Sequence, residues 1–284
     1  MSAGYTPGAT RTAAFRALHG RGCFVLPNPW DVGSARWLRG QGFAALATTS
    51  AGFAFTQGRP DQQVPLELML THIAELVASC PDLPFNADFE NGFADSPEDL
   101  FSTVNACLAT GVAGLSIEDA TGRADEPIYG FDLAVARIRA ARAALDHDGG
   151  GALLTARAEG VLVHGADALP DVLRRLSAFA EAGADVLYAP GIRTREQISA
   201  VVAAAGGKPV NLLMFGDLGL TVADVAALGV RRISVGAALA RAAWAAFIKA
   251  TALIRDEGSF AGFADNGRSA PLNRFFNDDL KERS

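Results

Sequence analysis

The sequence of 284 residues lacks long apolar runs: no uncharged stretch reaches the roughly 20 residues that a membrane helix needs. It also lacks a basic cluster, and its net charge of −6 argues against nucleic acid or an anionic membrane as the main partner. No charged segment followed by an apolar run stands at the N-terminus, so no signal peptide is predicted. We therefore expect a cytoplasmic protein that binds neither nucleic acid nor a membrane.

Several reactive side chains are scarce. The three cysteines are odd in number and lack metal-binding spacing, which indicates free and mostly buried thiols, at Cys23, Cys80 and Cys107. Lys208 precedes an apolar segment rather than ending one, which argues against a Schiff-base aldolase. A catalytic histidine is not expected, because all four histidines fall on predicted helices or loops away from the strand ends: His19, His72, His147 and His164.

What the sequence does contain is one repeated pattern. Short, almost continuous apolar segments alternate with helical patterns along the whole chain, as is typical of parallel strands covered on both faces. The predicted strands are residues 23–27, 43–49, 83–88, 113–118, 152–157, 185–189, 209–214 and 232–235.

Local signals mark the helices between these strands. Ser96-Pro97 is a typical helix start, and Thr194 with Gln197 forms a capping-box pattern. Four helices are predicted to end in a glycine just before a strand, at Gly42, Gly111, Gly183 and Gly229. Eight such β/α units predict an α/β protein, a (β/α)8 TIM barrel. The alternative, a doubly wound sheet, is disfavoured because no G-x-G-x-x-G follows the first strand.

We expect a single barrel domain over residues 1–284, with an N-terminal helix within residues 1–20 and a C-terminal helix and tail over 237–284. The predicted last helix, 237–254, is followed by a tail that is rich in phenylalanine: Phe260, Phe263, Phe275 and Phe276. So much apolar surface indicates that the tail packs on something. Its own barrel and a neighbouring subunit both remain open.

Polar residues gather where the predicted strands end, which is where a TIM barrel carries its chemistry. Strand three ends in F-N-A-D-F-E-N-G, and its alternating oxygen-bearing side chains form either a solvated edge or a cation site. The other strand-end residues are Glu118 and Asp119, Arg157 and Glu159, with Asn211 inside strand seven. Carboxylates facing an arginine would suit a hard cation and an anionic substrate.

Simpler interpretations exist for some of these residues. Asp31 is most simply a helix N-cap, and Glu159 is either a solvated loop acid or part of the site. Arg157 would be costly to bury without an anion, which favours an ion-paired or functional role.

At these residues the sequence resembles the isocitrate lyase/phosphoenolpyruvate mutase superfamily. The resemblance runs from about Asn28 to about Ala240 and rests on N-P-W-D-V-G-S-A-R, A-T-T-S-A-G-F, the G-R-P-D ending at Asp61, N-A-D-F-E-N-G-F, S-I-E-D and T-A-R. It implies a (β/α)8 barrel whose last helix is often exchanged between the subunits of a homodimer or homotetramer. It also implies a Mg²⁺ (or Mn²⁺) site and small anionic 2-oxo acid or phosphono acid substrates.

The resemblance also implies roles for single residues. Metal ligands, direct or through water, are expected among Asp88, Glu118, Asp61, Asn86 and Glu90. The turn that binds the substrate corresponds to Thr49, Ser50, Ala51 and Gly52, and Asn211 matches a substrate-contacting asparagine. Arg157 matches the arginine that grips the substrate anion, and Arg157, Glu118 and Asp61 are the expected catalytic residues.

Departures from the superfamily pattern reduce the number of reactions that we expect. Asn86 replaces the first acid of the usual D-A-D, and the loop after strand four, A-T-G-R-A-D-E-P-I-Y-G, lacks the cysteine or lysine found there in the lyases and mutases. We therefore expect a Mg²⁺-dependent lyase or decarboxylase that acts on a C–C or C–P bond next to a 2-oxo acid, through an enolate. The alternatives are phosphonomutase-type C–P chemistry and a non-catalytic barrel that binds a small acid.

Overall fold

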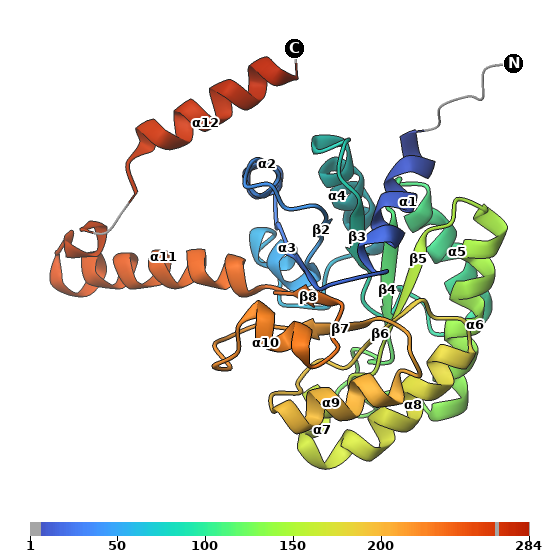
Figure 1. Ribbon diagram of the computed structural model, residues 1–284. Coiled ribbons are helices and arrows are strands. Elements are labelled where there is room, and N and C mark those ends of the chain that lie inside the picture. The colour runs from blue at the N-terminus through green and yellow to red at the C-terminus, as the bar shows by residue number, and fades with distance from the viewer. Residues whose placement is uncertain (1–6, 265–266, 284) are drawn as a thin grey trace, which may run out of the picture.

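The computed structural model describes residues 7–264 and 267–283 of the chain. The expected N-terminal helix and C-terminal tail extend over residues 1–6, 265–266 and 284, which lie outside the described residues. Eight parallel strands form the centre, and helices surround them (Figure 1). The strands are β1 (Phe24–Leu26), β2 (Leu46–Ala47), β3 (Phe85–Asp88), β4 (Gly114–Glu118), β5 (Leu153–Arg157), β6 (Val186–Tyr188), β7 (Val210–Leu213) and β8 (Arg232–Ser234).

The order of the strands shows that the sheet closes into a barrel. Each strand pairs in parallel with its sequence neighbour from β2 to β8, and β8 pairs in turn with β1. The remaining seam, between β1 and β2, is bridged by the Ala47 N–H, which donates to the Pro27 carbonyl at 3.1 Å. The Asn28 side chain also spans the seam, since its Nδ2 donates to the Thr48 carbonyl at 2.7 Å. The predicted (β/α)8 barrel is confirmed.

The helices cover the outside of this sheet, and the hydrophobic core lies between the two layers. In chain order the helices are α1 (Pro7–Leu18), α2 (Val32–Gly40), α3 (Ser50–Thr56), α4 (Leu66–Ser79), α5 (Pro97–Leu108), α6 (Phe131–Asp148), α7 (Gly160–His164), α8 (Leu169–Glu181), α9 (Arg195–Ala204), α10 (Val222–Ala227), α11 (Ala238–Glu257) and α12 (Ser269–Glu282). None of the helices in the described part of the chain combines the length and the hydropathy that crossing a membrane requires.

The local signals act as the sequence predicts. Ser96 caps α5 by accepting from the Asp99 N–H, and Thr194 with Gln197 forms the capping box of α9. All four predicted glycines adopt the left-handed backbone, with φ between 81° and 105°, which a residue with a Cβ rarely adopts: Gly42, Gly111, Gly183 and Gly229. Cys80 and Cys107 are buried, and Cys23 is half-buried; all three are free.

The two ends of the chain pack differently. Helix α1 lies across the amino-terminal end of the barrel, where Arg11 donates to the Pro81 and Gly111 carbonyls. Helix α11 projects away from the barrel, and α12 returns to α2 of the same chain (Figure 1). There, Arg36 pairs with Asp279 at 2.9 Å. The C-terminal tail therefore packs on its own barrel through α12, while α11 extends as an arm.

Candidate active site

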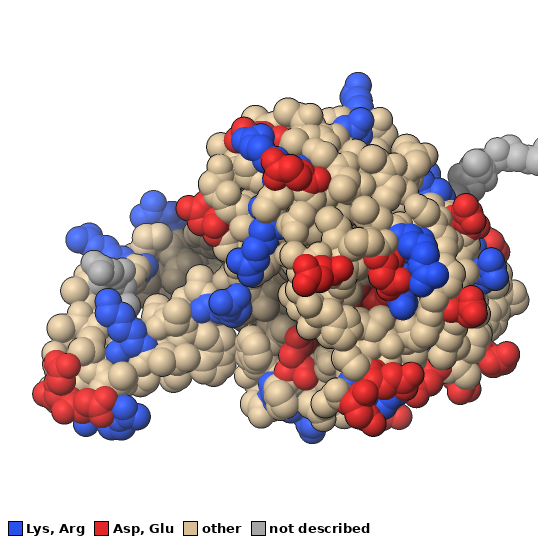
Figure 2. All heavy atoms as spheres, turned by 90° about the horizontal axis from the view of Figure 1, so that it is seen from below, with Lys and Arg blue, Asp and Glu red and all other residues tan. Residues whose placement is uncertain are grey.

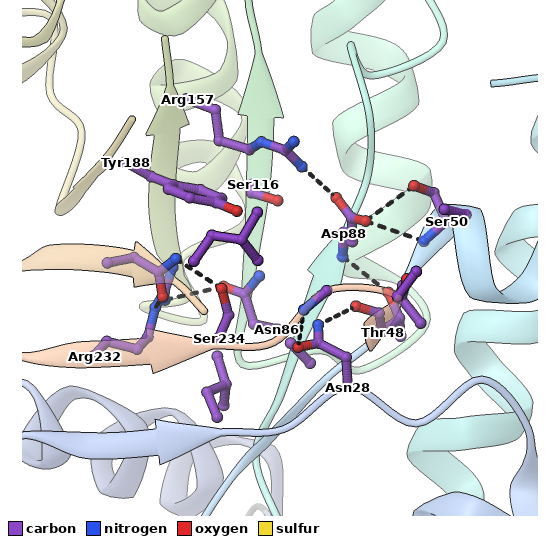
Figure 3. A pocket seen from close by; sticks show the side chains of 18 of the residues that line it. Asn28, Thr48, Ser50, Asn86, Asp88, Ser116, Arg157, Tyr188, Arg232 and Ser234 are labelled. Carbon is purple, nitrogen blue, oxygen red and sulfur yellow. Dashed lines mark hydrogen bonds and ion pairs between the residues drawn. The ribbon is translucent and has the colours of Figure 1, made fainter. Parts of the chain in front are cut away.

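A pocket of about 180 Å³ opens at the carboxyl ends of the strands (Figure 3). Its lining includes most of the residues that the sequence singles out, brought together from the turn after β2, from β3, β5 and β7, and from the loop before α4. These are Thr49, Ser50, Ala51, Asp61, Asn86, Asp88, Arg157 and Asn211. Two predicted residues, Glu90 and Glu118, line a smaller adjoining pocket of about 100 Å³ instead.

The turn after β2 presents a compact set of donors. The Ser50 N–H and hydroxyl both donate to Asp88 Oδ2, at 3.0 and 2.9 Å. Thr49 caps α3 by accepting from the Gly52 N–H, and a Cβ at Gly52 would lie 2.6 Å from the Thr49 methyl group. Only a residue without a side chain fits there. Gly52 thus allows the close packing of the turn without lining the pocket, whereas Thr49, Ser50 and Ala51 face the pocket.

Arg157 is the centre of the ionic network. Its Nη1 lies 2.7 Å from Asp88, its Nη2 3.0 Å from Glu118 and its Nε 2.8 Å from Glu159. Tyr188 packs against the same guanidinium, 5.0 Å from the ring centre. These carboxylates hold the pKa of Arg157 well above its usual range despite burial. Of the two roles that the sequence favours for Arg157, ion-paired or functional, the structure shows the ion pairing.

The structure supports the simpler interpretation for Asp31 but not for Glu159. Asp31 caps α2, since its side chain accepts from the Ser34 N–H at 2.7 Å. Glu159 is buried and bonded to Arg157, so it is not a solvated loop acid. The Glu159 N–H donates to Asp119 at 2.8 Å, and Asp119 itself pairs with Arg175. Asp119 therefore holds the backbone of Glu159 in place.

More carboxylates surround Arg157 than a single positive charge can neutralise. Burial, followed by the negative charge of Asp88, raises the pKa of Glu90 to about 8 and also raises that of Asp61, although the Asp61 side chain reaches solvent at the rim. Burial likewise raises the pKa of Glu118 well above its usual range. Glu90 is only 6% exposed, and its Oε1 has no hydrogen-bond partner in the structure.

This surplus of carboxyl groups fits a hard cation, whose positive charge would favour their ionised form. Oxygen donors suit Mg²⁺, and the unpartnered Glu90 oxygen is a buried acceptor that a hydrated cation would satisfy. Within residues 7–264 and 267–283, however, no three acids, histidines or cysteines are placed to hold one ion directly. A cation among Asp61, Asp88, Glu90 and Glu118 would therefore be bound largely through water.

The opposite side of the pocket carries a positive charge, on a residue outside the predicted site. Arg232, on β8, is 2% exposed and points into the barrel, where its Nε donates to Asn211 Oδ1 at 2.8 Å and its Nη2 to Thr155 at 3.0 Å. Its Nη1 lies 3.4 Å from His19 Nε2 and 3.5 Å from Asn86 Oδ1. Burial lowers the pKa of Arg232 to about 9. The sequence feature that could have pointed to Arg232 is an arginine at the start of an otherwise apolar strand.

Asn86 and Asn211 consequently lie on the Arg232 side of the pocket. Asn211 accepts from Arg232 and donates to Ser234 at 2.9 Å, while the Asn86 amide donates to the Ala87 carbonyl. Figure 3 shows Arg232 and Ser234 on one side of the pocket and Asp88 with Ser50 on the other. Asn86, expected among the metal ligands, thus lies beside a buried arginine.

Comparison with known proteins identifies the family. The family model of phosphoenolpyruvate phosphomutase matches residues 15–255, which is most of the chain. The chain belongs to the phosphoenolpyruvate phosphomutase family. This confirms the superfamily that the motifs indicate, whose members are lyases and mutases, and the protein is an enzyme of that group.

Individual relatives agree with this placement. The crystal structure of a putative lyase/mutase from Burkholderia cenocepacia J2315 is 49% identical, with a TM-score of 0.91 over 96% of this chain and 98% of that one. Oxaloacetate decarboxylase from Paraburkholderia xenovorans is 32% identical over 82% of this chain and 77% of its own length. A phosphonopyruvate hydrolase complex with oxalate and Mg²⁺ shares the fold at 24% identity, with a TM-score of 0.81 over 96% of each chain.

Proposed function

We propose that this enzyme is a Mg²⁺-dependent lyase or decarboxylase that cleaves a C–C bond adjacent to a 2-oxo acid, through an enolate. The observation that carries the proposal is the surplus of carboxylates around Arg157, beside a turn whose small residues face the same pocket. An oxaloacetate decarboxylase among the relatives supports this bond type, and the Mg²⁺ of the phosphonopyruvate hydrolase complex supports the ion.

The chain's own residues would bind and orient the substrate. The turn from Thr49 to Gly52 would hold the oxo and carboxylate oxygens, with Asn211 contacting the substrate from β7. Asp88, Glu118 and Asp61 would hold Mg²⁺ through water, and the ion would supply positive charge opposite the developing enolate oxygen. Arg157 keeps Asp88, Glu118 and Glu159 in place in this structure, and would contact the substrate anion once those acids face the ion.

Cleavage of a C–P bond is the second candidate, because phosphonopyruvate hydrolase shares the fold. Both candidates predict a 2-oxo acid product. Incubation with a panel of 2-oxo, 2-hydroxy and phosphono acids separates them by the co-product, which is carbon dioxide or a second carbonyl compound for the C–C lyase and phosphate for the C–P enzyme. Absence of any oxo acid product from the panel would contradict both.

The metal requirement is tested on Asp88. Asp88→Ala removes the acid that joins the Ser50 turn to Arg157, so we expect activity to be abolished. Exhaustive chelation should also remove activity, and Mg²⁺ or Mn²⁺ should restore it. Asp146→Ala, at an exposed acid on α6, is the control and should behave as the wild type. Full activity after chelation, or a working Asp88→Ala enzyme, would show that these acids do not form a metal site.

A further inference from the structure

The positive charge of Arg232 is buried without a countercharge. Among the described residues no carboxylate pairs with its guanidinium, whose acceptors are the neutral groups Asn211, Thr155, His19 and Asn86. Placing an unpaired charge in a barrel interior costs several kcal/mol. Packing alone does not require it, because an apolar side chain would fill a barrel interior at lower cost.

This charge belongs to the pocket and not to the outer layers. Arg232, Asn211 and Ser234 all line the same cavity as Asp88 and Ser50. The acids stand on the β3, β4 and β5 side, and the arginine stands on the β7 and β8 side (Figure 3). The pocket is therefore electrically polarised across its width.

Two features of the sequence strengthen this polarity. Asn86 places an uncharged amide near Arg232 where the superfamily pattern has an acid, so the charge of the arginine is not cancelled. Arg157, the other arginine of the pocket, already contacts three carboxylates. Of the two arginines, only Arg232 is left with its charge uncompensated by the protein.

We propose that Arg232 is a specificity-determining residue that binds an anionic group of the substrate at the floor of the pocket, with Asn211 and Ser234 beside it. The fork of the guanidinium suits a carboxylate, and the nearby hydroxyl and amide supply further hydrogen bonds. The proposal deepens the proposed function and rests on it for the reaction. It implies that the substrate is a compact acid with one anionic group on this floor and another at the turn after β2.

Oxalate binding without metal tests the proposal independently of turnover. Calorimetry in excess chelator, at fixed ionic strength, should show that Arg232→Gln weakens oxalate binding at least tenfold. Arg137→Gln is the matched control, because Arg137 is equally buried but bonds to backbone carbonyls outside the pocket, and its oxalate affinity should match the wild type. Unchanged oxalate affinity in Arg232→Gln would overturn the proposal, whatever reaction the enzyme catalyses.

A second variant keeps the arginine and the shape of its surroundings. Asn86→Asp is nearly isosteric and places a carboxylate against Arg232, so oxalate should bind at least threefold more weakly in chelator. A crystal of the wild type with oxalate gives a readout that needs no variant. A carboxylate within hydrogen-bond distance of the Arg232 guanidinium supports the proposal, and oxalate bound only at the turn from Thr49 to Gly52 overturns it.

Discussion

At the scale of single residues, Arg157 holds three acids with three different nitrogens. A lysine at this position would keep the charge but lose this geometry. We expect Arg157→Lys to lower kcat/KM at least about tenfold, equivalent to roughly 1.4 kcal/mol. The effect is measured by steady-state kinetics with the substrate that the acid panel identifies. A thermal unfolding scan shows how much of the effect comes from reduced stability. Wild-type kinetics would remove Arg157 from the reaction.

His19 gives a second prediction at this scale, on pH. Its Nδ1 lies 2.8 Å from the Phe15 carbonyl, so Nδ1 carries the proton and Nε2 accepts from Arg232. Burial, followed by the charge of Arg232, lowers the pKa of His19 to about 3 from 6.5. Between these values the unfolded chain binds a proton that the folded protein does not, so stability falls as the pH falls below 6.5.

His19→Gln keeps a neutral donor and acceptor and removes this titration. Relative to the variant, the wild type should lose about 2 kcal/mol of unfolding free energy between pH 7.5 and pH 5, since each pH unit below 6.5 costs about 1.4 kcal/mol. Urea unfolding at several pH values measures the difference. His147→Gln, at an exposed histidine, is the control. Parallel pH curves for wild type and His19→Gln would contradict the burial of a neutral His19.

The acids and Arg157 could be predicted from sequence because strand ends meet at one edge of a barrel, whatever the details of packing. Arg157 contacts both Asp88 and Glu118, as that rule requires. Arg232 and His19 could not be found in this way. Whether a side chain near the start of a strand points inward depends on register, and one of the partners of Arg232, His19, comes from the opposite end of the chain.

At the scale of elements, each observed strand lies within its predicted range and is shorter, because apolar residues continue beyond the ladder bonds into the neighbouring loops. Helix α3 begins at Ser50, after Thr48 and Thr49 that follow the end of β2, where the sequence indicates only a turn. The predicted helix 237–254 is observed as α11, over Ala238–Glu257. The sequence of the tail does not predict that α12 packs on α2, because that contact depends on how the two helix surfaces fit together.

The shape of that contact is set by Gly40, the last residue of α2. A Cβ there would lie 2.3 Å from Phe275 of α12, whose ring also packs against Trp37 with centroids 4.7 Å apart. We expect Gly40→Ala to loosen α12, with an overpacking cost of about 1–3 kcal/mol. Hydrogen exchange of α12 should accelerate while that of the barrel strands is unchanged.

Gly33→Ala is the matched control on the same helix. A Cβ at Gly33 meets its nearest atoms at 3.6 and 3.9 Å, which is ordinary contact. Exchange of α12 in this variant should equal that of the wild type. Equal protection of α12 in Gly40→Ala would show that α12 does not depend on this close approach.

At the scale of the whole molecule, α11 is a long arm that carries several exposed apolar side chains. Figure 2 shows it projecting beside the barrel, with a hollow between them. A pocket near the start of the arm is lined by Trp30, by Leu239 of α11 and by Leu272 of α12. Along the arm, Phe247 and Ile248 are 58% and 60% exposed. We propose that this surface is covered in a homo-oligomer, a dimer or a tetramer.

Light scattering of the full-length protein should give a multiple of the 29.5 kDa chain mass. Deletion of residues 259–284 should weaken or abolish association. Phe247→Asp should do the same with one substitution, whereas Val222→Asp, at an exposed apolar residue on α10, should not. A monomeric mass for the full-length protein would exclude this assembly.

The contact between His19 and Arg232 also bears on the order in which parts of the barrel can form. It joins residues 213 positions apart, and the Asn28 side chain likewise accepts from the backbone of Val235 and Gly236, 207 and 208 positions further on. During synthesis, His19 and Asn28, which follow α1 and β1, therefore remain without these partners until β8 and the two residues after it have left the ribosome. Closure of this barrel is a late event, completed when the oldest and youngest parts of the sheet meet.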